Sequence, residues 1–230
     1  MNIAGLQKTT LLDFPGLVAC TVFLSGCNLR CPFCHNASLV LPESMETAQI
    51  SENDLMAFLQ KRQGKLDGVC ITGGEPTLYD DLPDLLHKIH SLGFRTKLDT
   101  NGTHPHFLRT LIKENLVDYV AMDIKNSPEH YACTCGNIDC LALVRESVSV
   151  LMENKIEYEF RTTVSHPLHC VDDFTAIGQW LQGAPRYYLQ QFQDSGHLIG
   201  SGLTSFSPDE MENARRAAAA YIPNTMIRGL

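Results

Sequence analysis

The segment LVACTVFLSGCNLRCPFCH, residues 17–35, is where the prediction of the fold begins. Its first part, residues 17–24, is a nearly continuous run of apolar β-forming residues, typical of a strand buried on both faces of a parallel sheet. Cys27, Cys31 and Cys34 follow at once with the spacing C-x₃-C-x₂-C. Thiolates are soft ligands that suit zinc and iron–sulfur clusters. A closed zinc site or a fully ligated cluster needs a fourth protein ligand. Three closely spaced thiolates therefore indicate a cubane with one iron left open for a small molecule.

Two other interpretations of this loop stay open at this point. One is a zinc site completed by His35. The other is a set of buried or redox-active cysteines that bind no metal. A short motif has a real risk of false matches, so the rest of the chain has to support the cluster.

Further motifs follow the cysteines in order along the chain. They are GCNLRCPFCHN at residues 26–36, TGGEP at 72–76, LDTNG at 98–102, MDIK at 122–125, FRTTV at 160–164 and QQF at 190–192. Together they resemble the glycyl-radical-enzyme activating branch of the radical S-adenosylmethionine (radical SAM) superfamily, and within it the activating proteins of anaerobic ribonucleoside-triphosphate reductase. The resemblance covers nearly the whole chain.

The resemblance implies a cofactor pair and a reaction. Cys27, Cys31 and Cys34 would hold three irons of a [4Fe-4S] cluster, and S-adenosylmethionine would chelate the fourth through its amino and carboxylate groups. One electron from the cluster would cleave the cofactor into methionine and a 5′-deoxyadenosyl radical. That radical would remove a hydrogen from a backbone glycine of a partner, expected to be anaerobic ribonucleotide reductase. A flavodoxin- or ferredoxin-type protein would donate the electron.

The other motifs predict the pocket for S-adenosylmethionine. Gly73 and Gly74 lack side chains, so the backbone can approach a ligand closely. Glu75 is expected to pair with the methionine ammonium through a charge-assisted hydrogen bond. Phe33 is a candidate to shield the cluster and pack against adenine, with ordinary packing as the alternative.

Charged residues complete the predicted pocket. Asp123 and Lys125 are two residues apart on an expected strand, so both side chains point to the same face. By resemblance, Lys125 contacts the carboxylate of the cofactor, Arg161 and Thr163 lie on its side of the barrel, and His166 and Gln191 are candidates for the rim. The alternative for Asp123 and Lys125 is a solvated ion pair. The resemblance also suggests a monovalent cation held by Asp99, Thr100, Met122 and Asp123.

The order of elements predicts an α/β fold. Helical patterns alternate with expected strands at residues 17–24, 68–72, 94–99, 117–124, 156–164 and 187–192, which indicates parallel βαβ units. Residues 1–16 are expected to be a lead-in, and 226–229 a last short strand. The resemblance implies that the chain, residues 1–230, is a single radical SAM domain with a partial (β/α)₆ TIM-like barrel. The predicted site residues follow strand carboxyl ends, where β/α barrels place their active sites.

Composition limits the remaining possibilities. The chain has 230 residues, 44% of them hydrophobic, and a net charge of −8, so nothing favours binding to nucleic acid or to anionic membranes. We find neither a signal peptide nor an apolar segment long enough to cross a bilayer. Nine cysteines in such a chain favour metal chemistry in a reducing compartment, and hence a cytoplasmic location.

Cys133, Cys135 and Cys140 depart from the pattern of the family, in which this loop is poor in cysteine. They form either an accessory metal site or a set of free surface thiols. We expect free thiols, because C-x-C-x₄-C matches no standard zinc spacing. An accessory site would favour an enzyme that modifies a small molecule or a peptide. An iron–sulfur scaffold or electron-transfer protein is the alternative from another functional class.

Overall fold

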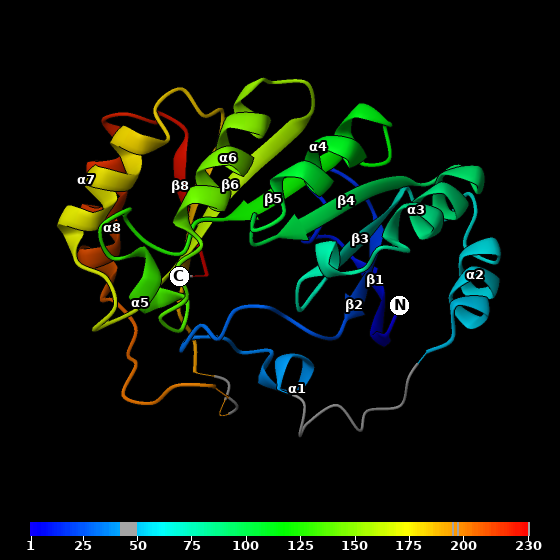
Figure 1. Ribbon diagram of the computed structural model, residues 1–230, viewed down its shortest axis with the longest axis horizontal. Helices are drawn as coiled ribbons and strands as arrows, with labels where there is room; N and C mark the ends of the chain where they lie inside the picture. The colour runs from blue at the N-terminus through cyan, green and yellow to red at the C-terminus, as the bar shows by residue number, and fades with distance from the viewer. Residues whose placement is uncertain (42–49, 195, 197, 230) are drawn as a thin grey trace.

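The computed structural model describes residues 1–41, 50–194, 196 and 198–229, and its strands form one eight-stranded sheet in sequence order (Figure 1). The strands are β1 (Ile3–Thr10), β2 (Ala19–Leu24), β3 (Gly68–Gly73), β4 (Arg95–Thr100), β5 (Tyr119–Asp123), β6 (Glu157–Val164), β7 (Tyr187–Gln191) and β8 (Thr225–Arg228). Strands β2 to β8 are parallel, and β1 pairs antiparallel with β2.

Helices occupy the crossovers between the parallel strands, as a parallel sheet requires. They are α1 (Ala37–Val40), α2 (Glu52–Gln60), the 3₁₀ turn η2 (Pro76–Leu78), α3 (Leu82–Ser91), α4 (Pro105–Lys113), α5 (Tyr131–Thr134), α6 (Leu141–Met152), α7 (Val171–Trp180) and α8 (Pro208–Ala219). Figure 1 shows helices α2, α3, α4, α6, α7 and α8 in an arc around the outside of the sheet. The predicted partial barrel of six βα units, with a short last strand, is confirmed.

Burial explains why these segments form these elements. Strand β2 is buried at five of its six positions, as its apolar sequence predicts. Helix α3 buries Leu82, Leu85, Leu86 and Ile89 against the sheet, a stripe at helical spacing. No helix in the described part of the chain is long and apolar enough to cross a membrane.

Residues 1–16, expected as a short lead-in, contain a strand that the sequence did not predict, β1. Strand β1 pairs with β2 from Ile3 opposite Leu24 to Thr10 opposite Ala19, with two shifts in register. Only Ile3 and Thr10 are buried in it, and residues 7–9 are exposed and polar. The segment therefore shows no alternation of apolar and polar residues, and its extended conformation comes from pairing with β2.

Candidate functional site

A cavity of about 410 Å³ lies at the carboxyl ends of the parallel strands. It brings together residues from the cysteine loop and from β3 to β7. The predicted residues that line it are Cys27, Cys31, Phe33, Cys34, Gly73, Gly74, Asp99, Thr100, Asp123, Lys125, Arg161 and Thr163. A cavity of this size suits a cofactor-sized ligand. The motifs that are spread along the sequence thus form one site.

The cysteine loop is shaped by its own backbone and by Arg30. The Arg30 guanidinium donates hydrogen bonds to the carbonyls of Cys27 (2.7 Å) and Leu29 (2.8 Å), and the Leu29 N–H donates to the Cys27 sulfur (3.4 Å). Burial raises the pKa of Cys27 to about 11, and burial also raises the pKa of Cys34. Both shifts refer to the protein without a metal, and a coordinating ion removes the proton from a thiol.

No three cysteine, histidine, aspartate or glutamate side chains within the described residues are placed to hold a single metal ion. A [4Fe-4S] cluster sets its cysteines around a larger core and does not need such convergence. The donor set on the cavity wall, three thiols from one loop, fits a cluster with an open iron.

Gly73 and Gly74 hold the cysteine loop against β3. The Gly74 N–H donates to the Leu24 carbonyl (2.7 Å), and the Glu75 N–H donates to the Gly26 carbonyl (2.8 Å). A β-carbon on Gly74 would lie 1.9 Å from the Gly26 oxygen, and one on Gly73 would lie 2.3 Å from the Leu24 oxygen. The missing side chains therefore permit close contact between two backbones, in addition to leaving that edge open to the cavity.

Glu75 differs from its predicted role. Its side chain is fully buried and is not among the residues that line the cavity. The carboxylate accepts hydrogen bonds from the Thr77 N–H (3.1 Å) and hydroxyl (2.5 Å), the Thr100 hydroxyl (2.7 Å) and the Asn101 N–H (2.6 Å). Burial raises the pKa of Glu75, while these donors favour the ionised form. Glu75 thus joins the end of β3 to the end of β4, and its contact with the cofactor stays a prediction.

We expect Glu75→Gln to lower the stability of the protein. The amide offers one acceptor oxygen in place of two, so at least one buried donor loses its partner, at about 1–3 kcal/mol for each group. For a chain of this size the thermal midpoint should fall by roughly 2–12 °C. Glu114→Gln, at an exposed position after α4, is the matched control in thermal unfolding. An unchanged midpoint for Glu75→Gln would contradict the structural role.

The charged residues that line the cavity form a network of ion pairs. The Arg161 guanidinium bridges Asp99 (3.0 Å) and Asp123 (2.9 Å), and Lys125 Nζ lies 2.9 Å from the Asp123 carboxylate. Lys97, which is 2% exposed, pairs with Asp99 from within the barrel. Three cations and two carboxylates leave this network with a net charge of +1.

The network keeps its members ionised. Burial alone would raise the pKa of Asp123, yet Lys125 and Arg161 lower it well below its usual range. Burial opposes the charge of Lys125 as well, and Asp123 nevertheless raises its pKa. The alternative of a solvated surface pair for Asp123 and Lys125 is wrong, since the two side chains are only 29% and 13% exposed.

The residues predicted to bind a monovalent cation already have partners within the chain. Asp99 and Asp123 are paired as described above. The Thr100 hydroxyl donates to Glu75 and accepts from the Gly102 N–H (3.1 Å). The Met122 side chain is fully buried and does not line the cavity. The four groups therefore do not fit a cation site as the structure places them.

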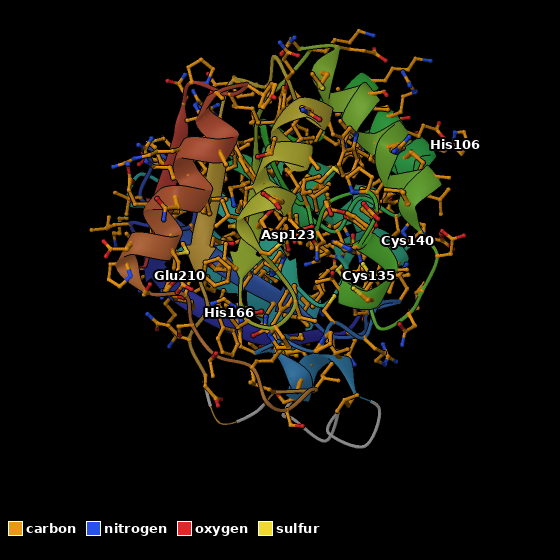
Figure 2. All side chains as sticks on the ribbon, turned by 90° about the vertical axis from the view of Figure 1, so that its left-hand side faces the viewer. His106, Asp123, Cys135, Cys140, His166 and Glu210 are labelled. Atoms are coloured by element: carbon orange, nitrogen blue, oxygen red, sulfur yellow. The ribbon has the colours of Figure 1, made fainter. Side chains whose placement is uncertain are left out.

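Phe33 and the rim candidates have distinct positions. Phe33 lines the cavity, is 4% exposed, and lies 5.6 Å from Lys125 Nζ, a cation–π distance. His166 stacks on Phe206 with its Nε2 3.2 Å from Glu210 (Figure 2). Gln191 donates to the Phe206 carbonyl (2.6 Å), and its neighbour Gln190 lines the cavity instead.

Two residues of the site were missed from the sequence. Lys97 is two residues before Asp99 on β4, so it shares its face, but a lysine in a strand resembles a solvated residue until its burial is known. Asn101 belongs to the LDTNG motif, in which the resemblance assigns a role only to Asp99 and Thr100. Its amide donates to the Asn28 side chain (2.9 Å), so it fixes the cysteine loop to the end of β4.

The expectation of surface thiols at residues 133–140 is wrong for two of the three cysteines. Cys133 is exposed, whereas Cys135 is fully buried and Cys140 is 5% exposed. Figure 2 shows Cys135 and Cys140 close together. The Arg30 N–H donates to the Cys135 carbonyl (3.3 Å), and the Cys135 side chain lowers the pKa of Cys31 against the effect of burial. The loop therefore packs directly behind one of the predicted cluster ligands.

Comparison with known proteins assigns the family. The model of the Radical SAM superfamily matches residues 21–176. A protein of Methanocaldococcus jannaschii, named as a glycyl-radical enzyme activating enzyme, is 29% identical over 234 residues, covering 98% of this chain and 95% of that protein. The pyruvate formate-lyase-activating enzyme of Clostridium pasteurianum is 30% identical over 144 residues, covering 59% of this chain and 57% of that enzyme.

Solved structures agree on the fold. SuiB of Streptococcus suis, also crystallised with S-adenosylmethionine, matches with a TM-score of 0.71 at 15% identity. The match covers 92% of this chain and 49% of SuiB, so the chain spans about half the length of that neighbour. Since the superfamily model covers more than half of the chain, from β2 into α7, the protein belongs to the Radical SAM superfamily.

Proposed function

We propose that this protein is a glycyl-radical-enzyme activase whose partner is anaerobic ribonucleoside-triphosphate reductase. The observation that carries the proposal is the single cavity in which three thiols of one loop face the Asp99–Asp123–Lys125–Arg161 network. A full-length relative named for this activity supports it. A flavodoxin- or ferredoxin-type protein donates the electron, and the reaction takes place in the cytoplasm.

Each part of the chain has a defined task in this proposal. Cys27, Cys31 and Cys34 hold three irons of a [4Fe-4S] cluster. When bound, the cluster supplies the electron that cleaves S-adenosylmethionine, and the resulting 5′-deoxyadenosyl radical removes a hydrogen from a glycine of the partner. Lys125 binds the carboxylate of the cofactor, since the network to which Lys125 belongs has a net charge of +1. Phe33 packs next to Lys125 and keeps water from this side of the cavity. Arg161 and Thr163, both on β6, border the cofactor.

Lys125→Ala should weaken the binding of S-adenosylmethionine while leaving the iron content intact. A charge-assisted hydrogen bond contributes about 1.5–3 kcal/mol, so we expect the dissociation constant to rise roughly 10- to 100-fold. Equilibrium binding to the iron-loaded protein measures it. Lys88→Ala, on the outer helix α3, is the control and should bind normally. Normal binding by Lys125→Ala would remove the residue from the pocket.

We further propose that the site works without a monovalent cation, because Lys97 and Arg161 supply the positive charge at Asp99. Exchanging sodium and potassium for the bulky tetramethylammonium ion should leave the affinity for S-adenosylmethionine unchanged. Lys97→Met removes one charge, and this variant should bind more weakly in tetramethylammonium than in potassium. A wild-type protein that loses affinity without potassium would restore the cation site.

The activase function is tested by mixing the reduced, iron-loaded protein with S-adenosylmethionine and anaerobic ribonucleotide reductase. Electron paramagnetic resonance should show a glycine-centred radical on the reductase, and the Cys34→Ala variant should give none. Production of 5′-deoxyadenosine without a glycyl radical would favour a small-molecule or peptide substrate. A protein that produces no 5′-deoxyadenosine would be an iron–sulfur scaffold or electron carrier.

A further inference from the structure

One buried histidine, His169, lies close to the cavity without lining it. Its side chain is in the segment between β6 and α7 and is 3% exposed. The imidazole Nε2 lies 2.9 Å from the Lys125 carbonyl oxygen, while Nδ1 lies 3.3 Å from the Ser165 nitrogen and 3.2 Å from its oxygen. Burial lowers the pKa of His169, which favours the neutral ring. A carbonyl can only accept, so the one ring proton is on Nε2, and Nδ1 accepts from the Ser165 N–H.

Side chains hold both polar groups of the Lys125 backbone. Lys125 lies two residues beyond the end of β5. Its N–H donates to the Tyr131 hydroxyl (3.3 Å), and its carbonyl accepts from the His169 imidazole (2.9 Å). Both partners are buried, Tyr131 on α5 and His169 before α7. Two segments outside the sheet therefore fix the backbone from which the Lys125 side chain starts.

The imidazole of His169 also packs against two phenyl rings. Its centroid lies 6.4 Å from that of Phe33 and 5.8 Å from that of Phe174, with interplanar angles of 41° and 27°. These are normal separations for aromatic pairs. The Phe33 ring in turn lies 5.6 Å from the Lys125 Nζ. His169 thus holds the backbone of Lys125 directly, and it packs against the ring that lies beside the ammonium of the same residue.

We propose that His169 is a positioning residue that fixes the Lys125 ammonium in the cavity, so that the affinity for S-adenosylmethionine depends on this histidine. The inference rests on the proposed contact between Lys125 and the carboxylate of the cofactor. A lysine ammonium is a point charge on a flexible stem, and its pairing with Asp123 alone does not set where that stem begins. His169 fixes the start of the stem, and Phe33 packs beside its end. A group that is already in place loses less freedom when a ligand binds, which raises the affinity.

Two substitutions separate the hydrogen bond of His169 from the volume of its ring. His169→Phe keeps an aromatic ring in the same place but cannot donate to the Lys125 carbonyl. His169→Gln loses the ring but keeps an N–H donor near the position of Nε2. We expect the dissociation constant of S-adenosylmethionine for the iron-loaded protein to rise roughly 3- to 30-fold in His169→Phe, the range for a lost buried hydrogen bond. His169→Gln should recover most of this affinity.

If His169→Phe takes up no iron, His169→Asn replaces it in the comparison. The shorter amide of asparagine reaches the position of Nδ1 but not the Lys125 carbonyl, so His169→Asn should bind the cofactor more weakly than His169→Gln. Equal affinities of these two amide variants would overturn the proposal. Equilibrium binding measures the affinities, and thermal unfolding of the same samples measures the stability of each variant.

A double-mutant cycle with Lys125→Ala distinguishes positioning from a general effect on the fold. If His169 acts through Lys125, His169→Phe should weaken binding in the wild-type background and cause no further loss in the Lys125→Ala background. Independent, additive losses would overturn the proposal. His90→Phe is the matched control, because His90 on α3 is within hydrogen-bonding distance of Thr96 and Asp118 and does not line the cavity. This variant should bind the cofactor normally.

The cycle also separates this inference from the proposal on which it rests. Normal binding by His169→Phe, with weakened binding by Lys125→Ala, would overturn the positioning role alone. Normal binding by Lys125→Ala would overturn both the contact with the carboxylate and the role of His169. None of these measurements depends on the identity of the partner enzyme.

Discussion

Replacing any one of Cys27, Cys31 or Cys34 by alanine should abolish the visible absorbance of the cluster and all cleavage of S-adenosylmethionine. In the proposed cluster each of these thiolates would hold one iron, and the fourth iron would bind the cofactor. Loss of one thiolate would leave only two protein ligands. Two ligands are too few to hold a four-iron cluster firmly. Iron analysis and anaerobic assay of 5′-deoxyadenosine measure the two effects.

The exposed cysteines provide the controls for this experiment. Cys133→Ala and Cys170→Ala should keep about four irons per chain and normal cleavage, as expected for thiols outside a single cubane. Near-normal turnover in any ligand variant would show that its cysteine is not a ligand. Cys31 gives the most informative comparison, because Cys135 lies directly behind it. A cluster retained in Cys31→Ala but lost in Cys31→Ala with Cys135→Ser would assign the ligand role to Cys135.

The second large effect is expected for Gly74→Ala, which changes no predicted ligand of the cluster. The new β-carbon would lie 1.9 Å from the Gly26 carbonyl oxygen, which is far closer than non-bonded atoms approach. The obstacle is backbone, so the end of β3 and the cysteine loop must separate, and the hydrogen bond from Gly74 to Leu24 is strained. Forced repacking of this kind costs about 1–3 kcal/mol or more. We therefore expect poor iron incorporation and a lower thermal midpoint.

Gly5→Ala is the matched control for Gly74→Ala. Gly5 lies in the edge strand β1, which pairs with β2, and a β-carbon there would be 3.6 Å from the Phe23 ring, an ordinary contact. This variant should incorporate iron normally. If Gly74→Ala binds iron as well as Gly5→Ala does, the two backbones are not in close contact in the working protein.

The order of the elements could be predicted from the sequence because its signals are local. The apolar run in β2 and the leucine stripe of α3 each identify an element without reference to the rest of the chain. The same holds for Cys27, Cys31 and Cys34, which lie within one short loop. Strand β1 was missed because its polar, partly exposed sequence depends on β2 for its conformation.

The residues that the sequence placed wrongly are those whose surroundings come from distant segments. The carboxylate of Glu75 is a typical group for binding a ligand, but donors from Thr100, at the end of β4, and from Asn101, directly after it, satisfy this carboxylate. From the sequence, Lys97 resembles a solvated residue. Only the folded structure shows that it is buried and paired with Asp99.

The sequence by itself determined the βα order, the three cysteines of the loop and most of the predicted residues that line the cavity, because these depend on short-range spacing and on which strand end a residue follows. The tertiary structure alone decided the partners of each charged group and the burial of Cys135 behind Cys31, more than a hundred residues away. The physical reason is that hydrogen bonds and ion pairs act over a few ångströms. Which groups come within that range is set by the packing of β3, β4 and the turn before α6, and not by their separation along the chain.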